Sequence, residues 1–301
     1  EMIAWREPLA ERAPGDVVIE AFGCELPEAQ LRRMAQRRDR PPVWINLEYL
    51  SAEDYVERSH ALPSPQSSGP AAGLPKWFFY PGFTARTGGL LREPGLIDSR
   101  RSFDREAWLA ERGWTRRPGE RVISLFCYEQ PALSAWLQQY AQQPTLLLAT
   151  AGPAARQVEA VLGSSQTLGA LRVKVVEPLP QPDYDRLLWS ADLNIVRGED
   201  SFVRAQWAGV PFVWHIYPQH DGAHRAKLEA FLDRFLAGGA VEPASHDAIR
   251  AQQRAWNEGA EPPALRPDAA AWHRGCTAWR DALCRQDDLT TQLLQFVAER
   301  R

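Results

Sequence analysis

Residues 197 to 209, RGEDSFVRAQWAG, place one arginine and two carboxylates directly after the apolar run ADLNIV. We expect a strand over that run, a sharp turn at Gly198, and a helix with Asp200 or Ser201 at its N-cap. The first backbone N–H groups of such a helix have no partner inside it, and they bind anions such as phosphates. Asp200 can simply cap the helix, whereas Glu199 can take hydroxyl groups of a ligand whose phosphates lie on those N–H groups.

Aromatic and amide side chains follow two further apolar runs that have the composition of strands. The run ISLFCYE ends with Phe126 and Tyr128 on one face of a strand, where they either pack in the core or contact a base or a phosphate. Gln181 and Tyr184 come just after LRVKVVEPL, at the start of a predicted helix. They are either surface residues or groups that hydrogen-bond to and stack on a base.

Arg197 and His215 are titratable residues of two more predicted strands. Arg197 either neutralises a diphosphate or pairs with Asp192 or Glu199. His215 lies within the apolar run PFVWHIY, where a satisfied core histidine is favoured over a catalytic one. Both residues therefore have a structural and a functional interpretation.

Several common kinds of site have no signature in the sequence. Neither GxGxxG nor a Walker sequence is present, which argues against a dinucleotide dehydrogenase and a P-loop NTPase. His220, Asp221 and His224 have a loosely metal-like spacing, but no HExxH motif or cysteine partner accompanies them, so we expect no metal. The cysteines lack CxxC spacing and are expected as reduced, mostly buried thiols. They are Cys24, Cys127, Cys276 and Cys284.

Length and composition indicate two domains with ample core, because the chain has 301 residues of which 45% are hydrophobic. The net charge of −3 gives no sign of a nucleic-acid groove, and the arginines between Arg32 and Arg40 are expected to form a solvated helix face. No apolar run approaches the roughly 18 residues of a membrane span and no leader is recognisable, so we expect a cytoplasmic protein with no membrane contact. The first residues, EMIAWREPL, resemble an interior strand, and we expect an N-terminal segment to precede them.

Apolar runs alternate with helical patterns along most of the chain, which is typical of parallel strands covered by helices. Examples are DVVIEAF followed by PEAQLRRMAQRR, and TLLLAT followed by PAARQVEAVLG. The Pro-, Gly- and Ser-rich run between Pro63 and Pro75 is expected as a mobile loop. We predict an α/β protein with two doubly wound halves across a cleft: residues 1–116, residues 117–266, and C-terminal helices in 267–301 that pack back on the first half.

Ligands of open parallel sheets bind outside the carboxyl ends of the strands. In the second half, that rule brings four segments to one rim: 126–129, 178–184, 197–201 and 217–221. The convergence favours the ligand interpretation of Glu199.

In the first half, polar residues follow the predicted strand VWIN. Ser51 and Asp54 match a capping box, so Glu53 and Asp54 are expected to serve the helix that follows. Glu48 lies at the carboxyl edge of the strand, and we expect it to face the cleft. The run TARTGGLL offers either an ordinary turn or a backbone that can approach a ligand closely.

The sequence resembles the EarP family of GT-B glycosyltransferases, which are protein-arginine rhamnosyltransferases of bacterial translation elongation factor P. The resemblance is carried by WINLEYLSAEDYVERSHALPS, WFFYPGFTARTGGLLRE, ISLFCYE, YDRLLWSADLNIVRGEDSFVRAQWAG and WHIYPQ, and it runs from about Asp16 to the C-terminal helices. It implies a GT-B fold of two Rossmann-like domains, the first on the acceptor side and the second binding the donor. It further implies dTDP-β-L-rhamnose as donor, an arginine of elongation factor P as acceptor, an inverting transfer, and no metal or other cofactor.

The resemblance also implies roles for residues. Glu199 is implicated in turnover. On the acceptor side the resemblance supplies no residues, and our own candidates there are Glu48, from its place at the strand edge, and the loop from Pro63 to Pro75. Pro178 stands where family members carry an aromatic residue near the donor. The implied donor-binding residues are Phe126, Tyr128, Gln181, Tyr184, Arg197, Gly198, Asp200, Ser201 and Tyr217.

Catalysis in the family uses the first aspartate of an N-terminal stretch of the form DNYGDIG, as general base or to orient the guanidinium. No such stretch occurs in the 301 residues, and we expect it upstream of Glu1. Two alternatives stay open. In the first alternative, the chain is a non-catalytic truncated relative that binds a dTDP-sugar or elongation factor P. In the second, it is another enzyme that uses a nucleotide sugar, either a GT-B glycosyltransferase or an epimerase.

Overall fold

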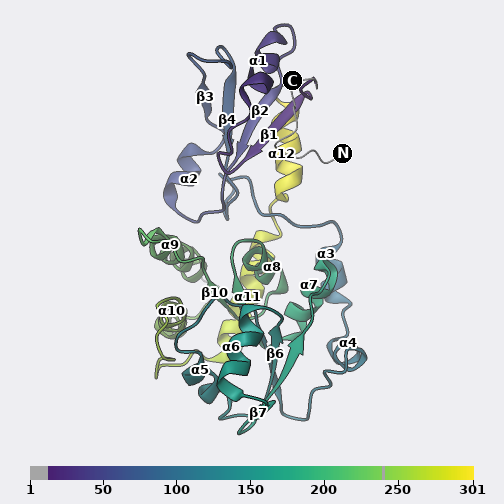
Figure 1. Cartoon of the computed structure of the whole chain (residues 1–301), viewed down its shortest axis with the longest axis vertical. Coiled ribbons are helices and arrows are strands. Elements are labelled where there is room, and N and C mark those ends of the chain that lie inside the picture. Colours follow the sequence, from purple (N-terminus) through teal and green to yellow (C-terminus); the bar gives the residue numbers. More distant parts are fainter. Residues whose placement is uncertain (1–12, 239–240) are drawn as a thin grey trace. The chain divides into compact units, whose positions relative to one another are not determined.

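The apolar runs of the sequence form the strands of two separate, mainly parallel sheets (Figure 1). The computed structural model describes residues 13–238 and 241–301, so the strand predicted at the start of the chain lies outside the described residues. The chain divides into two compact units: residues 1–92 with 286–301, and residues 93–285.

The first unit contains a four-stranded sheet in the order β1-β2-β4-β3. Neighbouring strands β1, β2 and β4 are parallel, so their carboxyl ends meet at one edge, and β3 pairs antiparallel with β4. The strands are β1 (Val17–Ala21), β2 (Val43–Leu47), β3 (Pro63–Pro65) and β4 (Pro75–Phe79). The unit also includes α1 (Glu28–Gln36), α2 (Asp54–Ser59) and α12 (Leu289–Ala298).

The final helix, α12, packs on one face of the first sheet. Phe296 lies edge-on to Phe79 and Trp77, at ring-centroid distances of 5.4 and 5.7 Å. Val297 is buried in the same cluster as Ile45. The last helix therefore belongs to the first unit, whereas α11 packs against α8 in the second.

Residues 63–75 do not form the mobile loop that their composition predicts. Residues 63–65 form β3, and Ala71 and Leu74 are buried in one cluster with Met34 of α1. The prediction is wrong because proline and glycine mark where the chain turns, while the apolar side chains between the turns still fill a core.

The capping box predicted at Ser51 and Asp54 is wrong for its serine, whereas Glu53 and Asp54 do stand at the start of α2 as predicted. The Ser51 hydroxyl accepts a hydrogen bond from the Glu53 N–H at 3.1 Å and donates to the Glu53 carboxylate at 2.9 Å. Glu53 takes the N-cap position of α2 without a side-chain bond to the helix. The serine therefore closes a turn just before the helix instead of capping it.

The second unit contains a six-stranded sheet in the order β10-β9-β5-β6-β8-β7, parallel except for β7. The order reverses at β5, as in doubly wound sheets. The strands are β5 (Arg121–Leu125), β6 (Thr145–Thr150), β7 (Thr167–Leu168), β8 (Leu171–Val176), β9 (Leu193–Arg197) and β10 (Phe212–His215). The helices described in the unit are α3 (Leu96–Arg101), α4 (Arg105–Glu111), α5 (Leu133–Tyr140), α6 (Pro153–Leu162), α7 (Gln181–Ser190), α8 (Asp200–Ala208), α9 (Ala223–Ala237), α10 (Pro243–Asn257) and α11 (Ala269–Leu283).

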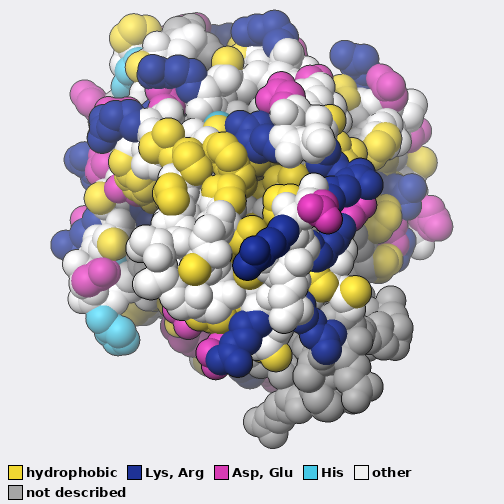
Figure 2. Space-filling view, turned by 90° about the horizontal axis from the view of Figure 1, so that it is seen from above, with side chains coloured by type: hydrophobic (Ala, Val, Ile, Leu, Met, Phe, Trp, Pro, Cys, Tyr) yellow, Lys and Arg dark blue, Asp and Glu magenta, His cyan; other side chains and the backbone are white. Residues whose placement is uncertain are grey.

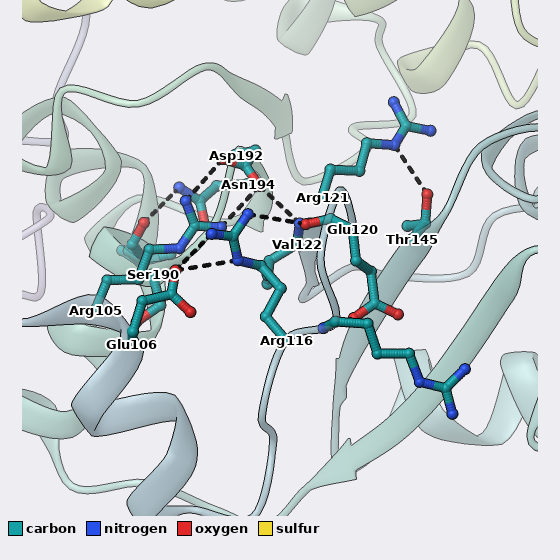
Figure 3. A network of polar contacts seen from close by, with 12 residues as sticks. Arg105, Glu106, Arg116, Glu120, Arg121, Val122, Thr145, Ser190, Asp192 and Asn194 are labelled. Carbon is teal, nitrogen blue, oxygen red and sulfur yellow. Dashed lines mark hydrogen bonds and ion pairs between the residues drawn. The ribbon is translucent and has the colours of Figure 1, made fainter.

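Residues 93–116 pack with the second unit, whereas their sequence pattern predicts a place in the first half. Trp108 of α4 is buried in one cluster with Val122 of β5. Arg105 donates two hydrogen bonds, of 2.9 and 2.7 Å, to the Asp192 carboxylate, which also accepts the Val122 N–H at 2.7 Å (Figure 3). Burial raises the pKa of Asp192, but the bonds from Arg105 and Val122 outweigh it and hold that pKa below its usual value. These contacts attach α4 to the sheet where β5 begins.

The surface carries charges of both signs. Figure 2 shows Lys and Arg side chains interspersed with acidic, apolar and polar ones on the face seen from above. In the arginine-rich segment, Arg32 pairs with Glu28 and Arg37 pairs with Asp16. Within residues 13–238 and 241–301, no helix is long and apolar enough to cross a membrane.

Candidate functional site

The carboxyl ends of β5, β6, β8 and β9 surround a cavity of about 490 Å³ in the second unit. The strand order reverses around β5, so the cavity lies where doubly wound sheets bind their ligands. Its volume falls within the range of small-molecule sites. The cavity is lined by Phe126, Tyr128, Thr150, Ala151, Val176, Glu177, Pro178, Leu179, Gln181, Tyr184, Arg197, Gly198, Glu199, Asp200 and Ser201.

Every predicted donor-binding residue except Tyr217 lines this cavity, and Glu199 lines it as well. Tyr217 follows β10, is 63% exposed, and lies edge-on to the Tyr128 ring at 5.5 Å. Tyr217 therefore adjoins the wall of the cavity rather than forming it. Pro178 contributes to the wall at the position where the resemblance implies an aromatic residue.

Arg197, the last residue of β9, is held by aromatic rings. Its guanidinium carbon lies 4.3 Å from the centre of the Phe126 ring and 4.9 Å from that of Tyr128. The guanidinium donates to the Cys127 carbonyl at 3.3 Å. Asp192 pairs with Arg105 instead, so the predicted alternative pairing with Asp192 is wrong. Among the described residues, Arg197 forms no ion pair with a carboxylate, and its charge lines the cavity.

The turn after β9 is fixed by a glycine and a serine. Gly198 has a φ of +68°, a conformation that other residues rarely adopt, and an added Cβ would lie 3.2 Å from the Tyr128 hydroxyl. The Ser201 hydroxyl accepts the Arg197 N–H at 3.1 Å and donates to the Arg197 carbonyl. The turn is thus closed on itself while its backbone faces the cavity.

The start of α8 has no side-chain cap. Glu199 occupies the N-cap position with a near-helical backbone, and its side chain accepts no hydrogen bond from the described first turn of the helix. The predicted N-caps, Asp200 and Ser201, are wrong by one and two positions, because Ser201 is committed to Arg197. In helix geometry the N–H groups of Asp200 and Ser201 have no carbonyl partner inside the helix, and both residues line the cavity.

A buried ion cluster lies behind this turn, and the sequence analysis missed it. Arg204 of α8 is 4% exposed and donates to both oxygens of Asp185 in α7, at 2.9 and 2.8 Å. Arg204 also pairs with Glu93, and its Nε lies 3.5 Å from the Asp200 carboxylate. Asp200 in turn accepts a hydrogen bond from Gln181 at 3.1 Å. The cluster joins α7 to α8, and the four-residue spacing of Asp200 and Arg204 was its only sequence signal.

The wall opposite the turn is apolar and aromatic. Tyr184 lies edge-on to Phe126 at 5.8 Å and packs against the cluster that contains Val176 and Leu187. Burial raises the pKa of Tyr184. Tyr184 therefore presents a ring to the cavity, whereas Gln181 is exposed at its mouth.

His215 is buried beneath the aromatic wall. It is 6% exposed, lies edge-on to Tyr128 at 5.3 Å, and pairs in register with Arg197 of the neighbouring strand. Burial and the nearby Arg197 charge lower the pKa of His215 to about 4, so the ring is neutral at pH 7. Its Nδ1 has no hydrogen-bond partner among the described residues. His215 is a core residue as predicted, but it is not fully satisfied.

Two of the three residues with metal-like spacing, Asp221 and His224, have other partners. His224 accepts the Gln219 N–H at 3.1 Å, and Asp221 accepts the Ala223 N–H at 3.0 Å. The described part of the chain holds no group of three or more His, Cys, Asp or Glu side chains that could bind a metal ion. All four cysteines are free, and burial raises the pKa of the Cys127 thiol to about 12.

A second cavity of the same unit, about 760 Å³, is larger and differs in kind. Helices α3, α4 and α7 line it together with the segments between them, and no strand end contributes. Three of its acidic side chains are Glu93, Asp104 and Glu111, and it shares Gln181 with the first cavity. The carboxyl-end cavity is the better candidate for an anionic ligand, because it combines Arg197 with a helix start.

Glu48 lies in the first unit, one residue after β2. Its N–H donates to the Phe79 carbonyl at 2.9 Å, and its carboxylate accepts the Asn46 amide at 2.5 Å. Glu48 therefore stands at the carboxyl edge of the first sheet, as predicted from the sequence.

Comparison with known proteins identifies relatives of the whole chain. The family profile described as "Elongation-Factor P (EF-P) rhamnosyltransferase EarP" matches residues 1–298. A protein-arginine rhamnosyltransferase of Pseudomonas aeruginosa is 47% identical over 99% of this chain and 82% of its own length. A second, from Pseudomonas putida, is 45% identical over 94% of this chain and 78% of its own length.

Solved structures agree with the sequence relatives. A structure described as the structural basis for EarP-mediated arginine glycosylation of translation elongation factor EF-P has a TM-score of 0.65 and 38% sequence identity to this chain. The match covers 73% of this chain and 75% of the other. The predicted α/β fold of the GT-B type is confirmed by this likeness and by the two mainly parallel sheets.

Proposed function

The chain belongs to the EarP family of elongation factor P rhamnosyltransferases, and on that premise we propose that it transfers L-rhamnose from dTDP-β-L-rhamnose to an arginine side chain of elongation factor P. The observation that carries the proposal is the carboxyl-end cavity of the second unit, where Arg197, the start of α8 and aromatic rings meet. Because the acceptor serves translation, we place the reaction in the cytoplasm.

The diphosphate of the donor is the part that this cavity suits best. The N–H groups of Asp200 and Ser201 begin α8 and carry the positive end of the helix dipole. Arg197 adds a guanidinium that pairs with no carboxylate among the described residues, and guanidinium groups bind phosphate oxygens through charge-assisted hydrogen bonds. In our proposal these groups neutralise the diphosphate without a metal, so a chelator such as EDTA should leave the transfer rate unchanged.

The nucleoside of the donor fits the apolar side of the cavity. Phe126 and Tyr184 offer ring surfaces on which a pyrimidine can stack. Gln181, at the mouth, carries both an amide donor and an amide acceptor for the polar edge of the base. Tyr128 and Tyr217 extend the aromatic surface beyond Arg197, toward the position of the sugar.

Transfer requires an activated arginine and a stabilised leaving group. A guanidinium stays protonated up to a pKa of about 13, so a carboxylate must orient it and accept a proton as its nitrogen bonds to the anomeric carbon. The bond from the anomeric carbon to the diphosphate oxygen breaks at the same time, and the charge that develops on dTDP falls on Arg197 and the α8 amides. The resemblance gives the role of this base to the first aspartate of a DNYGDIG stretch, which does not occur among the 301 residues. Glu199, which lines the cavity beside the diphosphate position, holds the sugar or ribose hydroxyls.

Two measurements on the same preparation test this function. The intact mass of elongation factor P should rise by one rhamnosyl group after incubation with the protein and dTDP-β-L-rhamnose. Titration calorimetry should show that dTDP binds the protein. A protein that binds dTDP and leaves the mass unchanged would be the non-catalytic binder, and one that does neither would contradict the proposed function altogether.

A further inference from the structure

The start of α8 carries an acidic side chain of its own. Asp200 is the first residue of α8, and its side chain is 65% exposed. An acidic side chain in the first turn of a helix is attracted to the N–H groups that have no partner inside the helix. In the proposed function those same N–H groups bind the diphosphate. The Asp200 carboxylate therefore competes with the donor unless another group holds it away.

Two side chains hold the Asp200 carboxylate. Gln181, the first residue of α7, donates a hydrogen bond to it at 3.1 Å. The Nε of Arg204, one turn further along α8, lies 3.5 Å from it. Residues four apart are neighbours on a helix surface, and the order with the acid nearer the N-terminus is the more favourable one. The contact with Arg204 thus draws the carboxylate toward the second turn of α8 and away from the N–H groups at its start.

Arg204 is itself fixed, because its guanidinium is bonded on other sides. Its side chain is 4% exposed. One terminal nitrogen donates to both oxygens of the Asp185 carboxylate in α7, at 2.9 and 2.8 Å, and the other donates to Glu93. A guanidinium has five N–H donors in a rigid fork, so it can bond two carboxylates and still face a third with its Nε. Arg204 can therefore hold Asp200 in one position.

We propose that Arg204 is a positioning residue for donor binding. It holds the Asp200 carboxylate off the start of α8 and so leaves the N–H groups of Asp200 and Ser201 open to a diphosphate. The described residues that line the carboxyl-end cavity do not include Arg204, so it acts through Asp200 rather than by contact with the donor. This inference rests on the proposed function, because that function makes the diphosphate the ligand of these N–H groups.

The test starts from a variant that keeps its fold. Arg204→Met/Asp185→Leu removes one positive and one negative buried charge together, so the net charge of the cluster does not change and stability is largely retained. It should bind dTDP about tenfold more weakly, because the Asp200 carboxylate then turns to the α8 N–H groups. Thymidine has no phosphate and should bind as before. Titration calorimetry measures both ligands, and urea denaturation checks that the variant is folded.

A third substitution identifies the group that Arg204 controls. Adding Asp200→Ala to the double variant should restore most of the dTDP affinity, because no carboxylate is left to compete. Asp200→Ala alone should change that affinity little, because Arg204 already holds the carboxylate. Asp233→Ala is the matched control in the double variant, since Asp233 is an exposed carboxylate of α9 that also pairs with an arginine, and it should restore nothing.

Several results would contradict this inference and leave the proposed function standing. They are an unchanged dTDP affinity of the double variant, an equal loss of thymidine affinity, and no recovery on adding Asp200→Ala. If the double variant does not fold, Arg204→Lys with and without Asp200→Ala gives the same comparison, because an ammonium keeps a charge at Asp185 but lacks the fork that also reaches Asp200. If the unchanged protein does not bind dTDP, the inference and the proposed donor site both fail.

Discussion

The two sheets present different chemistry at the same kind of place, the edge where parallel strands end. In the second unit, Arg197 ends β9 against the rings of Phe126 and Tyr128. In the first unit, Glu48 follows β2 beside Tyr49. Within the described residues neither Arg197 nor Glu48 forms an ion pair. Both units thus place one charged residue at the end of a parallel strand, Arg197 as the last residue of β9 and Glu48 directly after β2, and the two charges are opposite. This contrast suits an anionic donor on one edge and a cationic acceptor on the other.

The largest effect is expected in the Arg204 ion cluster, which packs behind the carboxyl edge of the sheet in the second unit. Arg204→Met leaves the Asp185 carboxylate buried without its partner, which should lower the free energy of unfolding by about 3–5 kcal/mol. Urea denaturation measures this loss. The double variant Arg204→Met/Asp185→Leu should regain much of it, because both charges are then gone. Equal stability of Arg204→Met and the unchanged protein would show that the cluster does not hold the edge.

A variant of Glu199 tests whether the carboxyl-end cavity of the second unit takes part in the transfer reaction or only binds the donor. Glu199→Ala should reduce turnover by about 10²–10³-fold, because contacts to a reacting sugar strengthen in the transition state. Glu129→Ala is the matched control, since Glu129 is exposed after β5 and outside the cavity. Initial rates from the mass of elongation factor P measure both variants. A melting temperature that falls in proportion to activity would favour a purely structural role for Glu199.

A variant of Arg197 tests whether the positive charge at the carboxyl-end cavity of the second unit binds phosphate. Arg197→Met should weaken dTDP binding by about 10–100-fold, the cost of a charge-assisted hydrogen bond, and leave thymidine binding nearly unchanged. Arg225→Met, an exposed arginine of α9, serves as the control. Titration calorimetry with both ligands makes the measurement. An equal loss of dTDP and thymidine affinity would contradict a phosphate role.

His215, which lies beneath the cavity of the second unit, should make the free energy of unfolding depend on pH. Its pKa of about 4 in the folded protein lies below the unfolded value near 6.5, so protonation favours the unfolded chain. Stability from His215 is complete above pH 6.5 and is lost as the pH falls toward 4. Between pH 7 and pH 5 the free energy of unfolding should fall by roughly 1–2 kcal/mol because of this residue. His215→Gln should remove that part of the slope, and an unchanged slope would contradict it.

The strands of both sheets were predictable because their apolar runs are long and bounded by turn residues. TLLLAT forms β6 and the first five residues of VWINLEYL form β2, and the rule on strand ends placed Phe126 and Arg197 at one cavity. The short strand β3 and the buried Leu74 were not predictable from a composition that is typical of loops. Their structure depends on partners far away in the sequence.

The parts of the site that the sequence did not predict have two different origins. The Arg204 cluster joins α8 to Asp185 and Glu93, which no local pattern connects. The caps of α8 and α2 failed because Ser201 and Ser51 bond to neighbouring turns in place of helix N–H groups. The partners of Arg204 are set by tertiary packing, whereas the two serines follow a competing local hydrogen bond, and residue spacing predicts neither outcome.

We propose above all that the turn after β9 binds the diphosphate of a sugar nucleotide through its backbone N–H groups and Arg197. A crystal structure of the protein with dTDP tests it most directly. We predict phosphate oxygens within hydrogen-bond distance of the Ser201 N–H and the Arg197 guanidinium, with the base on the side of Tyr184. Density for dTDP in the helix-lined cavity beside α4 and α7, or an unoccupied carboxyl-end cavity at saturating dTDP, would contradict the account.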